Sequence, residues 1–420
     1  MIINADDVKK FRVIILIIHS LLAMQCLWAQ PTLSSDSIVK HFLLDSGVKV
    51  TEGNSVKLLK SGREKFDDLF EAVRHAKHHI HLEYFNFRND SIANALFALL
   101  AEKVREGVTV RALFDDFGNM SNNQPLRKRH LQKLHRQGIQ IYRFDPIRFP
   151  YVNHILKRDH RKIVVIDGRV AYMGGMNVAD YYINGTDVVG RWRDMHMRVE
   201  GPAVAELQLI FMDMWEQVTK EDLSTDPVYF PRPDTLADGV EMAIVDRYPG
   251  RTPESIRHAY VASINAAQHK IQLINPYFVP THSIKKALKQ AIDRGVDVQI
   301  MISAKSDIPF TPDASTYFAY RLAKRGAHVY LYEGGFHHSK IMMVDDAFCT
   351  LGSANLNSRS LRYDYEVNAF MFDHEVTQEL IDMFEEDKQD STPLTREVWH
   401  SRTPWKRFVG WFANLFAPVL

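Results

Sequence analysis

Cysteine is almost absent from this chain. Only two of its 420 residues are cysteines, Cys26 and Cys349, and Cys26 lies in an N-terminal segment with the layout of a leader. The mature chain is therefore expected to hold one thiol and no internal disulfide, which says nothing decisive about its compartment. The fold must rest on a packed core, and 420 residues with 46% hydrophobic content are enough for two or three domains.

A strong charge of either sign is also lacking. The chain has 52 Lys and Arg residues against 51 Asp and Glu residues, which gives a net charge of +1. Proteins that bind the phosphate backbone of nucleic acids commonly carry a basic field, and this chain has none overall. A local basic patch is compatible with this composition, but we expect no nucleic-acid partner.

The N-terminus lacks an unbroken hydrophobic run of membrane-spanning length. Residues 1–30 have the layout of a signal peptide, with a basic start, a short broken hydrophobic run and a small residue, Ala29, at the cleavage point. Leu27 is a poor residue two positions before that point, so an uncleaved N-terminal anchor is the alternative. Either one predicts that the rest of the chain is exported to the periplasmic or extracytoplasmic face of the cell membrane.

One short pattern is present twice. Counted from a His, both copies have Lys at +2, Asp at +7, Gly at +14, a small residue at +15 and Asn at +17. Because these matches occur in one register and are made twice, the risk of a chance match is very low. The first copy is His160, Lys162, Asp167, Gly174, Gly175 and Asn177, and the second copy is His338, Lys340, Asp345, Gly352, Ser353 and Asn355.

The spacing also predicts local structure. A His and a Lys two residues apart on a strand point to the same face, while the hydrophobic run that follows them is buried. Asp167 and Gly168 have the chemistry of a hairpin turn, and the chain then returns to bring Gly175 and Asn177 alongside. We therefore interpret Asp167 and its counterpart Asp345 as turn residues with a structural role, although they belong to the motif.

The repeated residues suit phosphodiester exchange. That reaction needs a nucleophile, a proton donor for the departing oxygen, and positive charge near the phosphoryl oxygens. Two histidines can divide the first two tasks. Lys162 and Lys340 supply the positive charge, and side chains that donate neutral hydrogen bonds, Asn177, Ser353 and Asn355, complete the phosphate-binding set. Such a site requires no metal and no cofactor.

The paired motifs resemble the HxKxxxxD motif of the phospholipase D superfamily. The resemblance implies a covalent phosphohistidine step, with His160 as nucleophile and His338 as general acid. It also implies that an acidic residue after the second motif, here Glu366, orients a motif histidine, and Asp194 is the candidate counterpart in the first half. Since both motifs lie in one chain, the expected catalytic unit is a monomer.

A narrower resemblance rests on five segments, Pro276–Pro280, with Asn275 in place of Thr, Gly335–Lys340, Gly175–Asn177, Trp192–Asp194 and Ser358–Ser360. These segments are similar to those of bacterial cardiolipin synthases, and the resemblance covers about residues 60–420. It implies that the chain makes cardiolipin from two phosphatidylglycerols, with release of glycerol, through a phosphatidyl-histidine intermediate at a membrane surface. The alternatives are a lipid hydrolase with the same covalent step, an exported nuclease, and a lipid-binding protein on an inactive scaffold.

The order of strands and helices repeats as well. A strand at 80–85, a helix from Asp90 or Ser91 to Gly107 and a strand at 108–114 are matched in the second half by 271–274, 284–292 and 296–302. This alternation predicts an α/β fold, and the resemblance makes it two duplicated phospholipase D-type lobes, each a mixed sheet flanked by helices, with one active site between them. The predicted divisions are a linker at 31–50 inside lobe 1 (31–222), lobe 2 (223–390) and a C-terminal tail (391–420).

The C-terminal tail contains an amphipathic helix. Its hydrophobic face is Trp405, Phe408, Val409, Phe412, Leu415 and Phe416, with Lys406 and Arg407 beside it. Aromatic residues next to basic ones are typical of a helix that lies in a membrane interface, and a closing helix packed on the core is the alternative. The resemblance to a lipid-handling family favours the membrane.

Four histidines close together, His75, His78, His79 and His81, raise the question of a metal site. They span the junction of a predicted helix and a strand, and no second group of ligands stands at a metal-site spacing. We interpret them as part of an ordinary polar surface and predict no metal.

Overall fold

The computed structural model describes residues 33–150 and 156–416. The predicted signal peptide or anchor, residues 1–30, lies outside the described residues, as does the end of the predicted tail. Among the described residues, no helix is long and hydrophobic enough to cross a membrane.

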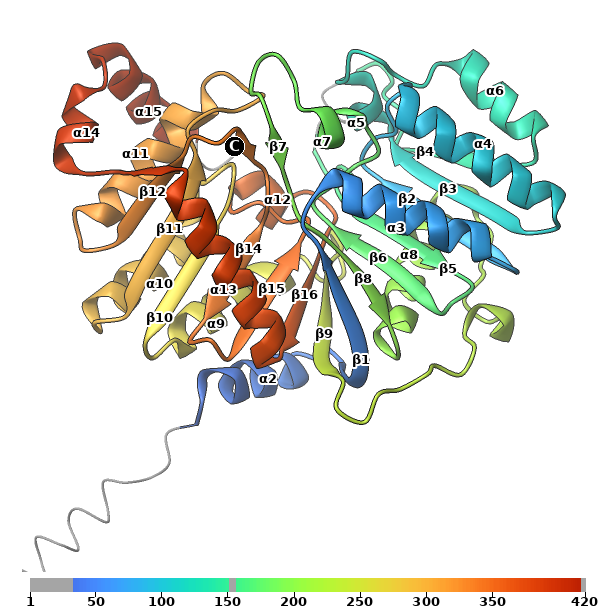
Figure 1. Ribbon diagram of the computed structural model, residues 1–420, viewed down its shortest axis with the longest axis horizontal. Helices are drawn as coiled ribbons and strands as arrows, with labels where there is room; N and C mark the ends of the chain where they lie inside the picture. The colour runs from blue at the N-terminus through green and yellow to red at the C-terminus, as the bar shows by residue number, and fades with distance from the viewer. Residues whose placement is uncertain (1–32, 151–155, 417–420) are drawn as a thin grey trace, which may run out of the picture.

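One sheet of fifteen strands runs through the whole molecule (Figure 1). The first lobe contributes the order β1-β8-β6-β5-β2-β3-β4, and the second contributes β9-β16-β15-β14-β10-β11-β12-β17. The first seven positions correspond one to one, and β17 is an additional edge strand. The predicted lobes are therefore two halves of one mixed sheet, joined where β1 and β9 pair antiparallel.

The strands of the first lobe are β1 (Val50–Leu59), β2 (His79–Tyr84), β3 (Thr109–Asp115), β4 (Gln140–Phe144), β5 (Lys162–Ile166), β6 (Val170–Gly174) and β8 (His196–Glu200). Those of the second lobe are β9 (Val240–Arg247), β10 (Lys270–Ile274), β11 (Asp297–Ser303), β12 (His328–Tyr332), β14 (Ile341–Val344), β15 (Phe348–Gly352), β16 (Glu366–Phe372) and β17 (Ser391–Pro393). A separate pair, β7 (Trp192–Arg193) and β13 (Phe336–His337), links the lobes in parallel.

Helices cover both faces of the sheet. In Figure 1, α3 and α4 lie in front of the first lobe and α13 lies in front of the second. The helices before the lobe crossing are α2 (Ser35–Asp45), α3 (Gly62–His75), α4 (Ser91–Arg105), α5 (Asp116–Met120), α6 (Lys128–Arg136), α7 (Tyr181–Asn184) and α8 (Ala203–Thr219). Those after it are the 3₁₀ turn η2 (Pro227–Tyr229), α9 (Ser255–Ala266), α10 (His282–Asp293), α11 (Thr311–Ala323), α12 (Ser358–Arg362), α13 (His374–Gln389), α14 (Arg396–Ser401) and α15 (Pro404–Phe416).

The local elements follow the signals in the sequence. The predicted helix start at Asp90 is confirmed, because the Asp90 carboxylate accepts the backbone N–H of Ala93 at the start of α4. The turn after β5 has positive φ at both Asp167 and Gly168, and the equivalent turn after β14 has positive φ at Asp345 and Asp346. These are the backbone conformations of a tight hairpin turn.

The linker predicted at residues 31–50 is wrong. Residues 35–45 form α2, which packs against α9 of the second lobe before the chain enters β1 of the first. Val39 and Leu43, one helical turn apart, are fully buried in the second lobe's core. Phe42 packs against the same core, so one hydrophobic face docks the helix.

The C-terminal tail is part of the second lobe. β17 pairs with β12, and α15 packs on α11, where Gly410 meets the backbone of Asp313. The other side of α15 is exposed, including Trp405 (69%) and Trp411 (48%). The helix therefore closes the core with one face and leaves an aromatic face uncovered.

We predict that Asp345 stabilises the fold and takes no part in chemistry. Its carboxylate accepts three backbone N–H groups, from Gln268 and His269 at 2.7 Å and from Lys270 at 2.8 Å. Asp345→Asn keeps a residue that tolerates positive φ but loses one acceptor oxygen, so urea denaturation should show a loss of about 1–3 kcal/mol. Asp346→Asn, at the next turn position, is the control and should leave the unfolding free energy unchanged. Loss of turnover by folded Asp345→Asn would contradict the structural role.

Candidate active site

The two motif histidines stand at equivalent places in the sheet. His160 precedes β5 and His338 precedes β14, and the backbone of the opposite lobe holds each of them. The N–H of His160 donates to the carbonyl of Tyr365 at 3.0 Å, and the N–H of His338 donates to the carbonyl of Arg193 at 2.6 Å. The two motifs therefore meet at the boundary between the lobes.

The orienting carboxylates are exchanged between the lobes. Nδ1 of His160 lies 3.0 Å from the carboxylate of Glu366, and Nδ1 of His338 lies 2.7 Å from that of Asp194. Each acid therefore pairs with the histidine of the other motif, which the sequence spacing alone does not reveal. With Nδ1–H donated to a carboxylate, each ring keeps Nε2 as its nitrogen for chemistry.

The small residue at motif position +15 makes room for these carboxylates. A Cβ on Gly175 would collide with the carboxylate of Asp194. At the equivalent position, the hydroxyl of Ser353 donates a hydrogen bond to Glu366. Ser353 thus supports an orienting carboxylate, which differs from the direct phosphate contact that the sequence predicts for it.

Both motif lysines are buried beside the histidines. Nζ of Lys162 donates to the carbonyl of His160, and Nζ of Lys340 donates to the carbonyl of His338. Burial lowers the pKa of Lys162 to about 7 and that of Lys340 to about 8, against the opposing effect of the nearby carboxylates. A bound phosphate anion would restore their full charge.

Burial also determines the protonation state of the two histidines. It lowers the pKa of His160 to about 4, although Glu366 acts in the opposite direction. The pKa of His338 is lowered by burial and by Lys340, against the effect of Asp194. Burial alone would raise the pKa of Asp194 and Glu366, but the histidines and lysines outweigh it and keep both acids ionised. Without substrate, neutral imidazoles therefore face ionised carboxylates, which suits a nucleophile.

The two motif asparagines lie close to the surface of the site, each 5% exposed. The side-chain oxygen of Asn177 accepts the N–H of Asn86 at 3.4 Å. Among the described residues, none donates a hydrogen bond to the side-chain oxygen of Asn355.

Lys65 is a residue that the sequence interpretation missed. It is fully buried on α3, and its Nζ donates to the carbonyls of Met176 at 3.2 Å and Asn177 at 2.9 Å. It therefore supports the segment that carries Asn177. A lysine four residues before Leu69, on the hydrophobic face of an amphipathic helix, was the available signal.

Asp167 and Asp345 do not belong to the catalytic group. Each lies at the end of its strand farthest from the histidine, where it accepts backbone N–H groups from the start of a neighbouring strand. The structure thus brings together six candidates, His160, Lys162, Asp194, His338, Lys340 and Glu366, and leaves the two motif aspartates outside the site.

Aromatic rings surround the histidines. Tyr277 and Trp192 lie 5.8 Å and 5.5 Å from the ring of His338 between centroids, and Phe85 lies 5.0 Å from that of His160. Phe278, which follows Tyr277, is instead buried in the core of the second lobe. The site therefore has an apolar wall to which Tyr277 contributes and Phe278 does not.

The polar surface predicted for the histidine cluster is wrong for two of its members. His79 and His81 are buried on the same face of β2, with ring centroids 4.7 Å apart and the ring of Phe211 stacked on His81. Gln208 of α8 bonds Nδ1 of His81 at 2.7 Å. In the described part of the chain, no three His, Cys, Asp or Glu side chains are grouped so as to hold a metal ion.

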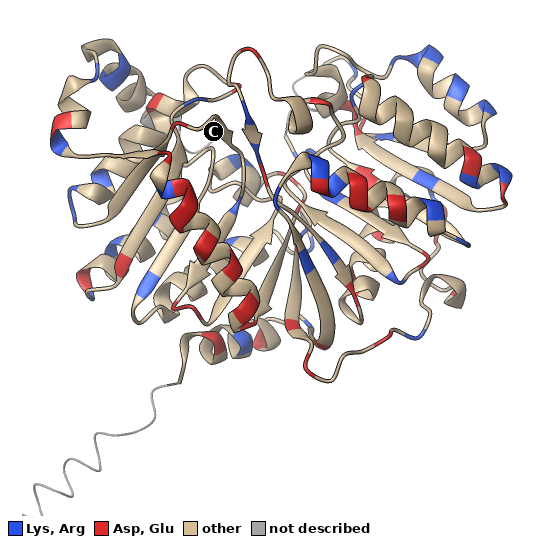
Figure 2. Cartoon of the chain, in the orientation of Figure 1, with Lys and Arg blue, Asp and Glu red and all other residues tan. Residues whose placement is uncertain are grey.

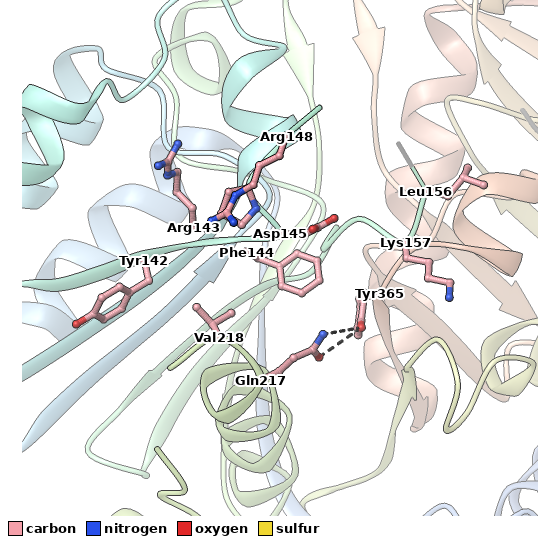
Figure 3. A pocket seen from close by; sticks show the side chains of 11 residues that line it. Tyr142, Arg143, Phe144, Asp145, Arg148, Leu156, Lys157, Gln217, Val218 and Tyr365 are labelled. Carbon is pink, nitrogen blue, oxygen red and sulfur yellow. Dashed lines mark hydrogen bonds between the residues drawn. The ribbon is translucent and has the colours of Figure 1, made fainter. Parts of the chain in front are cut away.

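A hollow of about 650 Å³ lies next to the site, and Tyr365 forms part of its wall (Figure 3). The hydroxyl of Tyr365 is hydrogen-bonded to the amide of Gln217 at 3.2 Å, and its carbonyl holds His160. The remaining lining comes from β4 and the residues after it, from residues 156 and 157, and from the end of α8.

The fold and the paired His–Lys motifs define an enzyme of the phospholipase D type. The crystal structure of phosphatidylserine synthase from Haemophilus influenzae matches with a TM-score of 0.67 at 14% identity, over 92% of this chain and 100% of that chain. Polyphosphate kinase from Porphyromonas gingivalis matches with a TM-score of 0.55 at 14% identity, over 82% of this chain and 49% of that chain. At such identities the likeness concerns the fold alone.

Sequence comparison narrows the class. The family model "Cardiolipin synthase, PLD-like domain" matches residues 69–215 and 260–388. The cardiolipin synthase of Oceanobacillus iheyensis is 37% identical over 385 residues, which are 92% of this chain and 79% of that protein. A probable cardiolipin synthase of Bacillus subtilis is 37% identical over 374 residues, 89% of this chain and 74% of that protein. This chain belongs to the cardiolipin synthase family, as its motifs predict.

We predict that activity falls as the pH rises above about 7–8. The pKa of Lys162 and of Lys340 is lowered, so their positive charge is present below these values and is lost as the pH rises through them. The ratio kcat/KM reports the free enzyme and should fall there, whereas kcat should fall at higher pH because bound phosphate stabilises the charged lysines. The assay uses detergent-dispersed substrate, so that the lipid surface stays the same as the pH is changed.

Lys162→Arg provides the control for this assignment. Arginine stays charged at every pH in question, so one alkaline ionisation should disappear from the profile of kcat/KM. A profile that is flat up to about pH 10, or one that Lys162→Arg leaves unaltered, would exclude the buried lysines as its cause.

Proposed function

We propose that this chain is a phosphatidyltransferase that makes cardiolipin from two phosphatidylglycerols and releases glycerol. The observation that carries this proposal is the pair of crossed His–carboxylate contacts, with a buried lysine beside each histidine. Membership of the cardiolipin synthase family supports the choice of lipid. Because one chain supplies both motifs, the catalytic unit is a monomer.

In the first step, Nε2 of His160 attacks the phosphorus of one phosphatidylglycerol. The bond from phosphorus to the headgroup glycerol oxygen breaks, and His338 donates a proton to that oxygen, so glycerol leaves and a phosphatidyl-histidine remains. Lys162 and Lys340 stabilise the charge on the non-bridging oxygens. In the second step, His338 takes the proton from a hydroxyl of the second phosphatidylglycerol, whose oxygen displaces His160 and forms cardiolipin.

The geometry favours His338 as the proton donor. A general acid must be cationic before it acts, and the carboxylate of Asp194 lies at 2.7 Å from its Nδ1, closer than Glu366 lies to His160. The incoming phosphodiester anion adds to this effect. The carboxylate of Glu366 is shared with the hydroxyl of Ser353, which weakens its support for a proton on His160. His160 therefore remains neutral and attacks.

Transfer and hydrolysis differ only in the molecule that accepts the phosphatidyl group from His160 in the second step. The aromatic rings of Tyr277, Trp192 and Phe85 form an apolar surround in which a lipid alcohol competes well with water. The exposed aromatic face of α15 would hold the site against a bilayer, where acceptor lipid is concentrated. We place the enzyme at the cell membrane with this lobe pair on the exported side, as the N-terminal sequence indicates.

The products test the choice between synthase and hydrolase. Purified protein given phosphatidylglycerol should yield cardiolipin and free glycerol in equal amounts, with little phosphatidic acid, by mass spectrometry of the lipids and an enzymatic glycerol assay. Mainly phosphatidic acid would replace the synthase with a hydrolase. Expression in cells that lack cardiolipin is the second readout, and the same cells expressing His160→Ala are the control.

The covalent step predicts a labelled histidine. Protein quenched in acid-free conditions during turnover of phosphate-labelled lipid should carry label on His160 that acid releases and base does not. His338→Asn should increase this label with a donor whose leaving group needs no proton, whereas His160→Ala should abolish both label and turnover. Label on His338 would reverse the two roles, and label on neither would exclude the intermediate.

A further inference from the structure

The surface helix α6 carries charge of only one sign. Between residues 127 and 136 the sequence is Arg-Lys-Arg-His-Leu-Gln-Lys-Leu-His-Arg, with no acidic residue. Only Leu134 of α6 is buried, and Leu131 packs partly against the core, so all the basic side chains face outward. Figure 2 shows the helix carrying Lys and Arg along its outer side. For a chain with a net charge of +1, this is a pronounced local excess.

These charges are not neutralised within the protein. In the described part of the chain, the ion pairs do not include Arg127, Lys128, Arg129, Lys133 or Arg136. By contrast, the exposed helix α3 carries charges of both signs and pairs Arg74 with Glu71. The neighbouring cations lower the pKa of His130 further, after burial. An uncompensated group of cations on a solvated helix attracts anionic surfaces outside the molecule.

Topology places the start of α6 at the same ends of the strands as the active site. α6 connects β3 to the parallel strand β4, so it starts near the end of β3. β3 ends at Asp115, whose carboxylate binds Nε of Arg158 and the N–H of Asp159, the residues directly before His160. The first turn of α6 therefore lies on the same side of the molecule as His160, which precedes β5.

The equivalent position in the second lobe is covered by the aromatic helix. α11 connects β11 to the parallel strand β12, as α6 connects β3 to β4, and α15 packs on α11. Figure 1 shows α6 and α15 at the two ends of one side of the molecule, the upper side in this view, with α5 and α7 between them. One side thus presents a basic helix on the first lobe and an aromatic helix on the second.

We propose that α6 is a contact for an anionic lipid surface and that it acts together with α15 to turn the side of the molecule that carries His160 toward the bilayer. This inference rests on the proposed lipid substrate. Stable membrane binding generally requires two signals, and an interfacial aromatic helix with a separate cationic patch supplies both. Because the two contacts lie on different lobes, they fix the orientation of the molecule as well as its attachment. The same charges also concentrate anionic substrate lipid near the site.

The test measures binding to vesicles separately from turnover. Full-length protein is sedimented with vesicles of phosphatidylcholine, with or without phosphatidylserine, an anionic lipid that is not the proposed substrate. The variant combines Lys128→Gln, Arg129→Gln and Lys133→Gln, since glutamine keeps the helix propensity. The control combines Lys286→Gln, Lys289→Gln and Lys324→Gln, which removes the same charge from α10 and from the residue after α11.

The α6 variant should bind the anionic vesicles about a hundredfold more weakly at low salt, because each basic residue near such a surface contributes about a fivefold factor. The control should lose much less. The difference should vanish on pure phosphatidylcholine and at about 1 M salt, where charges are screened within roughly 3 Å. Equal thermal unfolding and equal turnover of detergent-dispersed phosphatidylglycerol would show that the variant is folded and its site intact.

Unchanged vesicle binding by the α6 variant, or an equal loss in the control, would overturn the proposal. The proposal would also be overturned if the α6 variant kept its binding to vesicles but lost binding to a single-stranded oligonucleotide at about 0.15 M salt. That result would assign α6 to nucleic acid. Absence of cardiolipin from the detergent assay with unaltered protein would count against the proposed function alone. The vesicle result decides the role of α6 in either case.

Discussion

The exchange of carboxylates between the lobes is the constraint on which the site depends. Glu366 of the second lobe holds His160 of the first, and Asp194 of the first holds His338 of the second. Neither lobe contains a complete site, so the lobes must keep a fixed relative position to within a hydrogen-bond length. The continuous sheet across β1 and β9, and the small sheet of β7 and β13, provide that rigidity. The fifteen-stranded sheet therefore fixes the geometry of these two hydrogen bonds.

Electrostatic balance explains how so many charges can be buried at one place. Lys162 and Lys340 face Asp194 and Glu366, so the ionised side chains nearly cancel while the histidines are neutral. Burying unpaired charges would be costly, and pairing reduces that cost. This charge balance changes easily, because the lowered pKa of each lysine makes its protonation depend on whether an anion is bound. A bound phosphodiester anion would therefore favour the charged form of both lysines.

Local patterns in the sequence predict the residues of this site but not their partners. The repeated spacing locates His160, Lys162, His338 and Lys340 and the hairpin turns, because strand periodicity and turn chemistry act over a few residues. The pairing of Glu366 with His160 joins residues 206 positions apart, and no local signal encodes it. Tertiary packing likewise decides that the histidines of β2 are buried under α8. It also decides that α2 docks on the second lobe.

The near-equivalence of the two halves fits a reaction in which donor and acceptor are the same lipid. Each half offers a histidine and a lysine at the same motif positions, together with one orienting carboxylate, so either side of the phosphate meets similar chemistry. The equivalence is broken at motif position +15, where Gly175 admits Asp194 closely and Ser353 donates to Glu366. We propose that this difference makes the proton affinities of the two histidines unequal. Unequal affinities would assign attack to one histidine and proton transfer to the other within an otherwise similar pair of motifs.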